Sequence, residues 1–287
     1  MLYTAKIENK NGEVIELTQD ENNWQVVSIT GLNPPPAQVN LTPIAGLDGS
    51  VFNSAKLDTR ELVILMRING DAEENRLTLY RFSRTKEPCR FYYKSSRRDV
   101  FIDGYIQTAE ANLFEQGQVL QISVICPQPY FRSMEEIVED ISSTAALFCF
   151  PFSIDYGEPV PFSSFDVTRA TDVFNTSEAE TGVDMVAFIH AAVSKLYIVN
   201  TTTGEWLELD YSFQSGDRVL IDTVKGEKSL RLVRSGSTYN LFPALKAGSK
   251  FFQLQIGSNL FEYLADEGAS NQFVNIIVKR RDLFRGV

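Results

Sequence analysis

Residues 195–234 read KLYIVNTTTGEWLELDYSFQSGDRVLIDTVKGEKSLRLVR, and the pattern of apolar residues in them indicates the fold class. It contains four short apolar runs, at residues 195–200, 206–209, 218–223 and 229–234, separated by turns that contain glycine. Strands of this length that recur about every ten residues, with no helical segment between them, are typical of an antiparallel β-sandwich.

The same pattern continues on both sides of this stretch. Further strands are expected at residues 251–255, 260–264 and 273–279, while Pro151, Pro159 and Pro161 mark a boundary upstream. The sequence therefore predicts two domains joined by a connector, at residues 1–131, 132–161 and 162–287.

The N-terminal part is also expected to consist mainly of strands. Asn11-Gly12 is the dipeptide preferred in two-residue hairpin turns, because both central residues need positive φ. In the strand over residues 24–30, alternation places Trp24, Val26 and Ser28 on one face. The strands expected in this part lie at residues 2–8, 13–17, 24–30, 57–68, 90–94, 100–108 and 119–126.

One helix is expected, beginning after Asp71. Asp71-Ala72-Glu73-Glu74 resembles a capping box, and an apolar face follows before Pro88. That face consists of Leu77, Leu79, Tyr80 and Phe82. Residues 133–148 could form a short helix capped at Ser133, but a strand would suit them almost as well, so their structure stays open.

Composition excludes several classes of protein. The 287 residues are 44% hydrophobic and 22% charged, which excludes disordered, collagen-like and disulfide-scaffold chains. No apolar run approaches the length of a transmembrane helix, so membrane insertion is not expected. The odd number of cysteines, Cys89, Cys126 and Cys149, favours folding in a reduced compartment.

The charge is unevenly distributed. The net charge is −10, and residues 133–190 hold eleven acids against one base, whereas residues 76–98 hold eight basic groups against one acid. A strongly acidic chain is a poor nucleic-acid binder, because phosphate neutralisation supplies most of that affinity. The basic cluster fits either a nucleic-acid patch or, more simply, a solvated helix face plus an interface with an acidic surface.

Signatures of catalysis are largely absent. The single histidine, His190, lies in an apolar run, no cysteine spacing fits a zinc site, and Gly226-Glu227-Lys228-Ser229 lacks the upstream glycine of a phosphate-binding loop. We therefore predict a non-enzyme without metal or cofactor. Trp206, beside the turn at Thr203-Gly204, has two interpretations: a glycan contact or a cover for one end of the core.

Several segments occur together in a recognisable order. They are Gly46-Leu47-Asp48-Gly49-Ser50, Cys126-Pro127-Gln128-Pro129-Tyr130-Phe131, residues 198–204, residues 215–223, Gly257-Ser258-Asn259 and Gly286-Val287. With the strand at residues 60–68 and the helix at residues 75–82, these segments resemble the distal tail proteins (Dit) of siphophages that infect Gram-positive bacteria. The likeness spans nearly the whole chain and rests on order and spacing, since no single motif is diagnostic.

This resemblance implies a structural hub at the distal end of a phage tail, assembled in the cytoplasm of the bacterial host. It implies an N-terminal β-sandwich with one helix and an extended hairpin, and a galectin-like (jelly-roll) C-terminal β-sandwich. The N-terminal domains would form a homohexameric ring joining the tail tube protein to the tail-associated lysin or tail fibre protein. DNA would pass through the channel of this ring, and a receptor-binding protein is a further candidate partner.

Two groups of residues are the expected subunit contacts. Leu47, Val51 and Phe52 would lie in the hairpin or loop that reaches a neighbour, and Arg97 and Arg98 would face a neighbouring subunit or the tail tube. The alternative function is a receptor- or host-glycan-binding module of the tail tip, with Trp206 as the contact.

Overall fold

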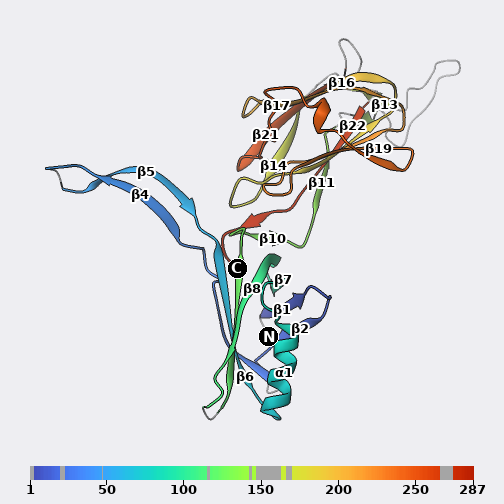
Figure 1. Ribbon diagram of the computed structural model, residues 1–287. Helices are drawn as coiled ribbons and strands as arrows, with labels where there is room; N and C mark the ends of the chain where they lie inside the picture. The colour runs from blue at the N-terminus through green and yellow to red at the C-terminus, as the bar shows by residue number, and fades with distance from the viewer. Residues whose placement is uncertain are drawn as a thin grey trace, which may run out of the picture. The chain divides into compact units, whose positions relative to one another are not determined.

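A computed structural model describes residues 3–19, 23–46, 48–114, 117–141, 144–146, 163–165, 170–265 and 274–287 (Figure 1). The chain divides into two compact units: unit 1 comprises Met1–Glu135 and Leu283–Val287, and unit 2 comprises Glu136–Asp282. The expected mainly β fold with one α-helix in the described residues is confirmed.

Unit 1 is built on one curled antiparallel sheet whose main path has the order β2-β1-β7-β8-β9-β6-β3. The free edges of β2 and β3 meet at one end, where the Val26 amide donates to the Thr18 carbonyl at 2.8 Å. Alternate residues of the strands point inward and form the core together with the helix. The strands are β1 (Tyr3–Asn9), β2 (Val14–Leu17), β3 (Trp24–Thr30), β6 (Arg60–Ile68), β7 (Pro88–Ser95), β8 (Asp99–Ala111) and β9 (Val119–Cys126).

Local signals in the sequence explain several of these elements. Gly12 turns the chain between β1 and β2 at φ 80°. Helix α1 (Ala72–Phe82) begins as expected, because the Asp71 carboxylate accepts from the Glu74 amide at 3.1 Å. Its buried residues are Leu79 and Phe82, whereas Leu77 is exposed, so the apolar face is narrower than the sequence suggests.

Two strand predictions for unit 1 are wrong in detail. The strand expected over residues 57–68 begins at Arg60, because Leu57 is the last residue of the preceding strand, β5 (Ser50–Leu57). Between the two strands the Asp58 carboxylate accepts from the Thr59 amide at 2.9 Å. In β3 a bulge between Val26 and Ser28 shifts the register. As a result Ser28 is exposed, and Ile29 packs against the core in its place.

Between β3 and β6 the chain forms the extended hairpin that the family resemblance implied. Strands β4 (Ala37–Pro43) and β5 (Ser50–Leu57) pair with each other in a separate two-stranded sheet, drawn as a long ribbon in Figure 1. Gly46 and Gly49, in the turn between them, both have positive φ.

The last residues of the chain return to unit 1. Strand β23 (Leu283–Phe284) pairs with β10 (Phe131–Ser133), which also pairs with β8, and the Val287 amide donates to the Leu32 carbonyl. Unit 2 is therefore inserted between β10 and β23 in the sequence. The sequence predicts domain limits at residues 131 and 161, and these limits remain a prediction. The division of the chain into two compact units falls instead after Glu135 and after Asp282.

Unit 2 contains two larger antiparallel sheets that share one core, as the pattern of residues 195–234 predicts. The six-stranded sheet has the order β11-β22-β15-β18-β19-β20, and the four-stranded sheet has the order β14-β21-β16-β17. The bounds are β11 (Ile137–Asp140), β14 (Ala170–Asn175), β15 (Asp184–Ile189), β16 (Val193–Asn200), β17 (Glu205–Phe213), β18 (Arg218–Asp222), β19 (Ser229–Arg234), β20 (Ser237–Asn240), β21 (Gly257–Ala265) and β22 (Val274–Arg280). A short pair, β12 (Thr144–Ala146) with β13 (Ser163–Phe165), and a 3₁₀ turn, η1 (Phe242–Ala244), complete the described elements.

Two further expectations for unit 2 are resolved. Where described, residues 133–148 form strands and no helix, and the Ser133 hydroxyl accepts from the Glu135 amide in a local turn. Residues 251–255, expected as a strand, make one isolated bridge between Leu254 and Thr181.

The two described cysteines are free thiols in the core of unit 1. Cys89 on β7 and Cys126 on β9 flank Gly104 on β8, where a Cβ atom would lie 3.0 Å from the Cys126 sulfur. Burial raises the pKa of each thiol to about 12, so both stay protonated and unreactive at neutral pH. Cys149 lies outside the described residues.

Candidate assembly surfaces

The β4–β5 hairpin exposes apolar side chains along its length. Val51 is 47% exposed and Phe52 is 62% exposed, and Phe52 lies opposite Leu41 in the register. The other exposed apolar residues of the hairpin are Val39, Leu41 and Ile44. Leu47, the third contact expected from the sequence, lies outside the described residues.

An isolated two-stranded hairpin is marginally stable in water. Side-chain bonds support this one, including Asn53 Nδ2 to Thr42 Oγ1 at 2.6 Å, and Gln38 donates to Asp58 at its base. Burial of the exposed apolar residues against another protein would stabilise it further. The hairpin therefore has the properties of an assembly arm.

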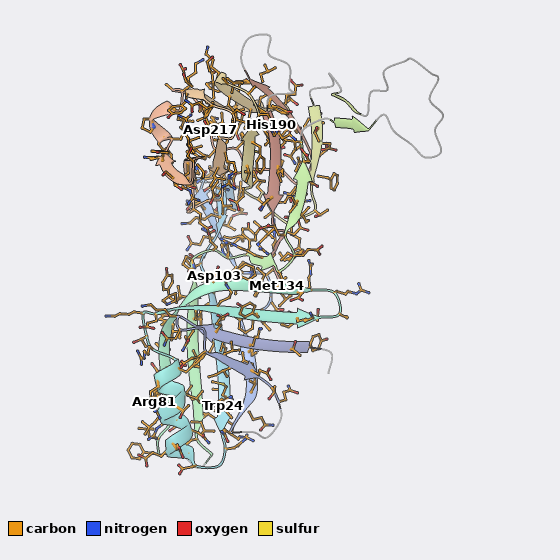
Figure 2. The ribbon with its side chains drawn as sticks, turned by 90° about the vertical axis from the view of Figure 1, so that its right-hand side faces the viewer. Trp24, Arg81, Asp103, Met134, His190 and Asp217 are labelled. Atoms are coloured by element: carbon orange, nitrogen blue, oxygen red, sulfur yellow. The ribbon has the colours of Figure 1, made fainter. Side chains whose placement is uncertain are left out.

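The basic cluster at residues 76–98 is partly neutralised within unit 1. Arg90 makes a two-bond contact with Asp103 at 2.6 and 3.1 Å, and Lys94 lies 2.7 Å from Asp99. Both acids belong to β8. Figure 2 labels Asp103 and also Arg81, a basic residue of the cluster that lies on the helix. Half-exposed pairs of this kind contribute little to stability, but they reduce the positive potential of the cluster.

Arg97 and Arg98 lie in the turn between β7 and β8, where both backbone amides donate to the Ser95 hydroxyl. Their side chains differ in environment. Arg97 is exposed, whereas the Arg98 guanidinium lies 3.8 Å from the centre of the Phe284 ring. Arg98 thus holds the returning C-terminal strand, and Arg97 is the more direct probe of a subunit contact.

A buried arginine in unit 1 was missed by the sequence analysis. Arg60, 2% exposed, donates to the carbonyls of Gly31, Asn33, Pro129 and Arg285, and its guanidinium lies 4.6 Å from the Phe131 ring centre. Burial lowers its pKa, but an arginine stays protonated in proteins. One side chain therefore joins two loops to the end of the chain.

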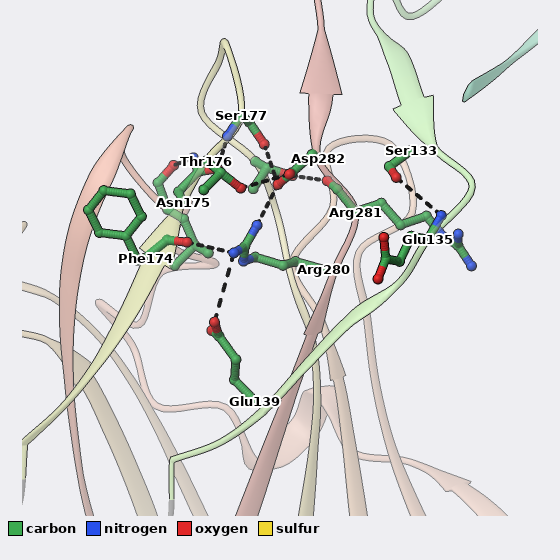
Figure 3. Close-up of polar contacts among 12 residues, drawn as sticks. Ser133, Glu135, Glu139, Phe174, Asn175, Thr176, Ser177, Arg280, Arg281 and Asp282 are labelled. Carbon is green, nitrogen blue, oxygen red and sulfur yellow. Dashed lines mark hydrogen bonds and ion pairs between the residues drawn. The ribbon is translucent and has the colours of Figure 1, made fainter. Parts of the chain in front are cut away.

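A second buried arginine, Arg280, organises unit 2 (Figure 3). It bonds the Asp282 carboxylate and the Phe174 carbonyl, both at 2.5 Å, and lies 3.8 Å from Glu139. Asp282 also accepts from the Thr176 hydroxyl at 2.7 Å. Burial raises the pKa of Glu139, and Arg280 opposes that shift. The cluster ties β11, β14 and β22 together.

Motif residues that carry the family resemblance also have structural roles in unit 2. Asn200 and Asn259 are fully buried, and Asn200 donates to the side-chain oxygen of Asn259 at 3.2 Å. The Asn259 amide group donates to the carbonyls of Gln255 and Gly257. These asparagines satisfy polar groups of the turn backbone, so their role in this chain is structural.

The residues considered for chemistry are separated in the structure. His190 is exposed just after β15, and Trp206 is half-buried on β17. Among the described residues there is no group of three or more His, Cys, Asp or Glu side chains able to hold a metal ion. The part of the chain that is described contains no helix with the length and hydropathy of a membrane span.

Comparisons with known proteins identify relatives of both the sequence and the fold. Residues 176–281 match the model of the siphovirus-type tail component, C-terminal domain. No curated protein sequence matches the chain. Among solved structures, the chain is similar to the Dit protein (gp 19.1) of SPP1, described as a paradigm of the hub adsorption apparatus in phages that infect Gram-positive bacteria.

The likeness in fold extends over nearly the full length of both chains. For SPP1 Dit the TM-score is 0.70 at 16% identity, over 99% of this chain and 100% of that one. A chain of the phage P2 baseplate in its activated conformation with Ca gives a TM-score of 0.54 at 13% identity, over 98% of each chain. The family model over residues 176–281 and the fold of the whole chain thus confirm the resemblance to siphophage distal tail proteins.

Proposed function

We propose that this protein is the ring-forming hub of a phage tail tip, a homohexamer that joins the tail tube to the tail-associated lysin or tail fibre and conducts DNA. The end-to-end likeness to SPP1 Dit supports this proposal, because that protein is described as a hub. The exposed apolar hairpin supports it independently, since a repeated arm can close a ring when each copy contacts the next.

The charge of the chain suits a conduit. A net charge of −10 disfavours the retention of DNA, and Arg90 and Lys94, two of the basic groups, face acids of the same unit. The role needs binding and shape and no bond-making step, so the proposal includes no catalysis, metal or cofactor. In it, the protein is a component of the virion at the distal end of the tail and is assembled in the host cytoplasm.

Phe52→Asp tests the arm. A charged side chain in place of the most exposed apolar residue of the hairpin should convert rings to monomers of 32.3 kDa, read by size-exclusion chromatography with light scattering. Tyr239→Asp is the matched control, because Tyr239 is 52% exposed but lies on β20 of unit 2. Rings that survive Phe52→Asp, or that dissociate equally with Tyr239→Asp, would contradict this role of the hairpin.

A further inference from the structure

The outer face of the four-stranded sheet in unit 2 carries an unusual set of side chains. Leu196, Ile198, Leu207 and Phe261 point into the core, so alternation places Tyr197, Trp206 and Glu262 on the opposite face. Glu262 and Trp206 both lie opposite Val199 in the register, on either side of it. The three side chains therefore share one surface over β21, β16 and β17.

The two aromatic rings are held in place before any ligand binds. The centres of the Tyr197 and Trp206 rings are 6.0 Å apart and their planes differ by 28°. The edge of the indole lies against Gly248, where a Cβ atom would lie 3.3 Å from Trp206 Cζ2. The Lys250 amide, donating to the Trp206 carbonyl at 2.7 Å, fixes this loop against β17. The pair is thus preorganised.

Polar atoms on the same face are free. Within the described residues, the Tyr197 hydroxyl, the Trp206 Nε1–H and the Glu262 carboxylate have no hydrogen bond or ion pair, and both rings are only half-buried. By contrast, the neighbouring acids Glu205 and Glu208 pair with Lys250 and Lys246.

We propose that Tyr197, Trp206 and Glu262 form a binding site for a neutral saccharide. The C–H face of a pyranose ring would lie on the half-exposed aromatic pair. Sugar hydroxyls would donate to the Glu262 carboxylate and accept from the indole N–H and the tyrosine hydroxyl. A free carboxylate in an acidic chain disfavours anionic polymers, so the site selects neutral sugars. This site would function whether or not the protein forms rings.

The two tryptophans of the chain allow a direct test. Trp24→Phe leaves Trp206 as the single tryptophan, and its fluorescence then reports on this surface. The probes are methyl α- and β-glucopyranoside, methyl β-galactopyranoside, N-acetylglucosamine and N-acetylgalactosamine, with glycerol 3-phosphate as the anionic comparison. We expect a saturable change with at least one neutral sugar and a weaker response, or none, with glycerol 3-phosphate.

Conservative variants separate binding from structure. In the Trp24→Phe background, Glu262→Gln and Tyr197→Phe keep size and packing but should each weaken binding about tenfold, the effect of about 1.4 kcal/mol. Tyr239→Phe, an exposed tyrosine on the other sheet, should leave binding unchanged. No saturable response to any neutral sugar, stronger binding of glycerol 3-phosphate, or binding insensitive to Glu262→Gln and Tyr197→Phe would each overturn the proposal.

Discussion

Arg60 in unit 1 and Arg280 in unit 2 are both buried, but their positive charges are surrounded by different groups. Arg60 donates to the carbonyl of Arg285, near the end of the chain, and Arg280 is the last residue of β22. The hydrogen-bond acceptors of Arg60 are backbone carbonyls, whereas Arg280 has Asp282 and Glu139 beside one carbonyl.

The two arginines therefore hold the chain in physically different ways. A guanidinium surrounded by carbonyls depends on the exact course of three backbone segments, and it is insensitive to the protonation of acids. The stabilisation by a guanidinium that pairs with carboxylates instead depends on the negative charge of those carboxylates. Removing such an arginine leaves a carboxylate whose charge is no longer compensated. The two units should therefore respond differently to mutation and to acid.

The largest effect is expected for Arg60→Met. It leaves four carbonyls without their donor, and unit 1 should lose about 3 kcal/mol of unfolding free energy. Chemical denaturation of a Trp206→Phe protein, in which Trp24 reports on unit 1, measures the loss. Hydrogen exchange at Leu283–Val287 should also become faster. Unchanged exchange there would contradict the role of Arg60 as the anchor of the chain end.

Arg280→Met is expected to destabilise unit 2 by about 2 kcal/mol, because Asp282 keeps its bond from Thr176 while Glu139 and the Phe174 carbonyl lose their partner. Chemical denaturation of the Trp24→Phe protein, in which Trp206 reports on unit 2, measures this loss. The control is the Trp206→Phe protein, in which the fluorescence of Trp24 reports on unit 1. If Arg280→Met lowered the stability of unit 1 as much as that of unit 2, the claim that each arginine stabilises its own unit would be wrong.

The arginine clusters also mark the limit of what the sequence predicts. Asn11-Gly12 and the Asp71 cap act within a few residues, so the hairpin and the helix could be placed from local patterns. Arg60 contacts Arg285, 225 residues away, and no local pattern indicates such a contact. The short C-terminal return was missed for the same reason, because two paired residues leave no periodic signal.

Acid should weaken a second ion pair of unit 2. Hydrogen bonds from Arg234, at 2.8 and 2.6 Å, lower the pKa of Asp217 below its ordinary value of 3.8. Its stabilisation is therefore fully present above about pH 4 and is lost as the pH falls through the lowered pKa. Asp217→Asn should reduce the stability of unit 2 at pH 7 by less than Arg280→Met does, with the difference from wild type vanishing in acid. A difference between Asp217→Asn and wild type that did not decrease as the pH fell below 3.8 would point to packing and not to charge.

The smallest change in stability is expected at Asp184, where a substitution should stabilise unit 2. Asp184 lies directly across from Asp222 in the neighbouring strand. Desolvation, and then the charge of Asp222, raise the pKa of Asp184. A raised pKa means that the charged carboxylate is less stable in the folded protein than in the unfolded chain. Removing the charge by Asp184→Asn should therefore increase the free energy of unfolding of unit 2 at pH 7. The gain should stay below about 1 kcal/mol, because the side chain is only partly desolvated and water still screens its charge. It should disappear as the pH falls below 3.8, and a loss of stability at pH 7 would contradict this sign.

The candidate surfaces were only partly predictable. The hairpin position of Val51 and Phe52 followed from the family resemblance, and their exposure agrees with an assembly arm. The basic cluster ends at Arg98 in the sequence, whereas the acids that pair with it, Asp99 and Asp103, lie just beyond it. The ion pairs Lys94–Asp99 and Arg90–Asp103 therefore could not be predicted from the composition of residues 76–98. Likewise, Trp206 could be singled out, but its neighbours Tyr197 and Glu262 depend on the register of three strands.

Native mass spectrometry of the unmodified chain measures directly whether the protein associates into a ring. We expect a dominant species of six copies, about 194 kDa from six times 32.3 kDa, formed alone or when the tail tube protein is added. A protein that stays at 32.3 kDa at high concentration, both alone and with that partner, would contradict it.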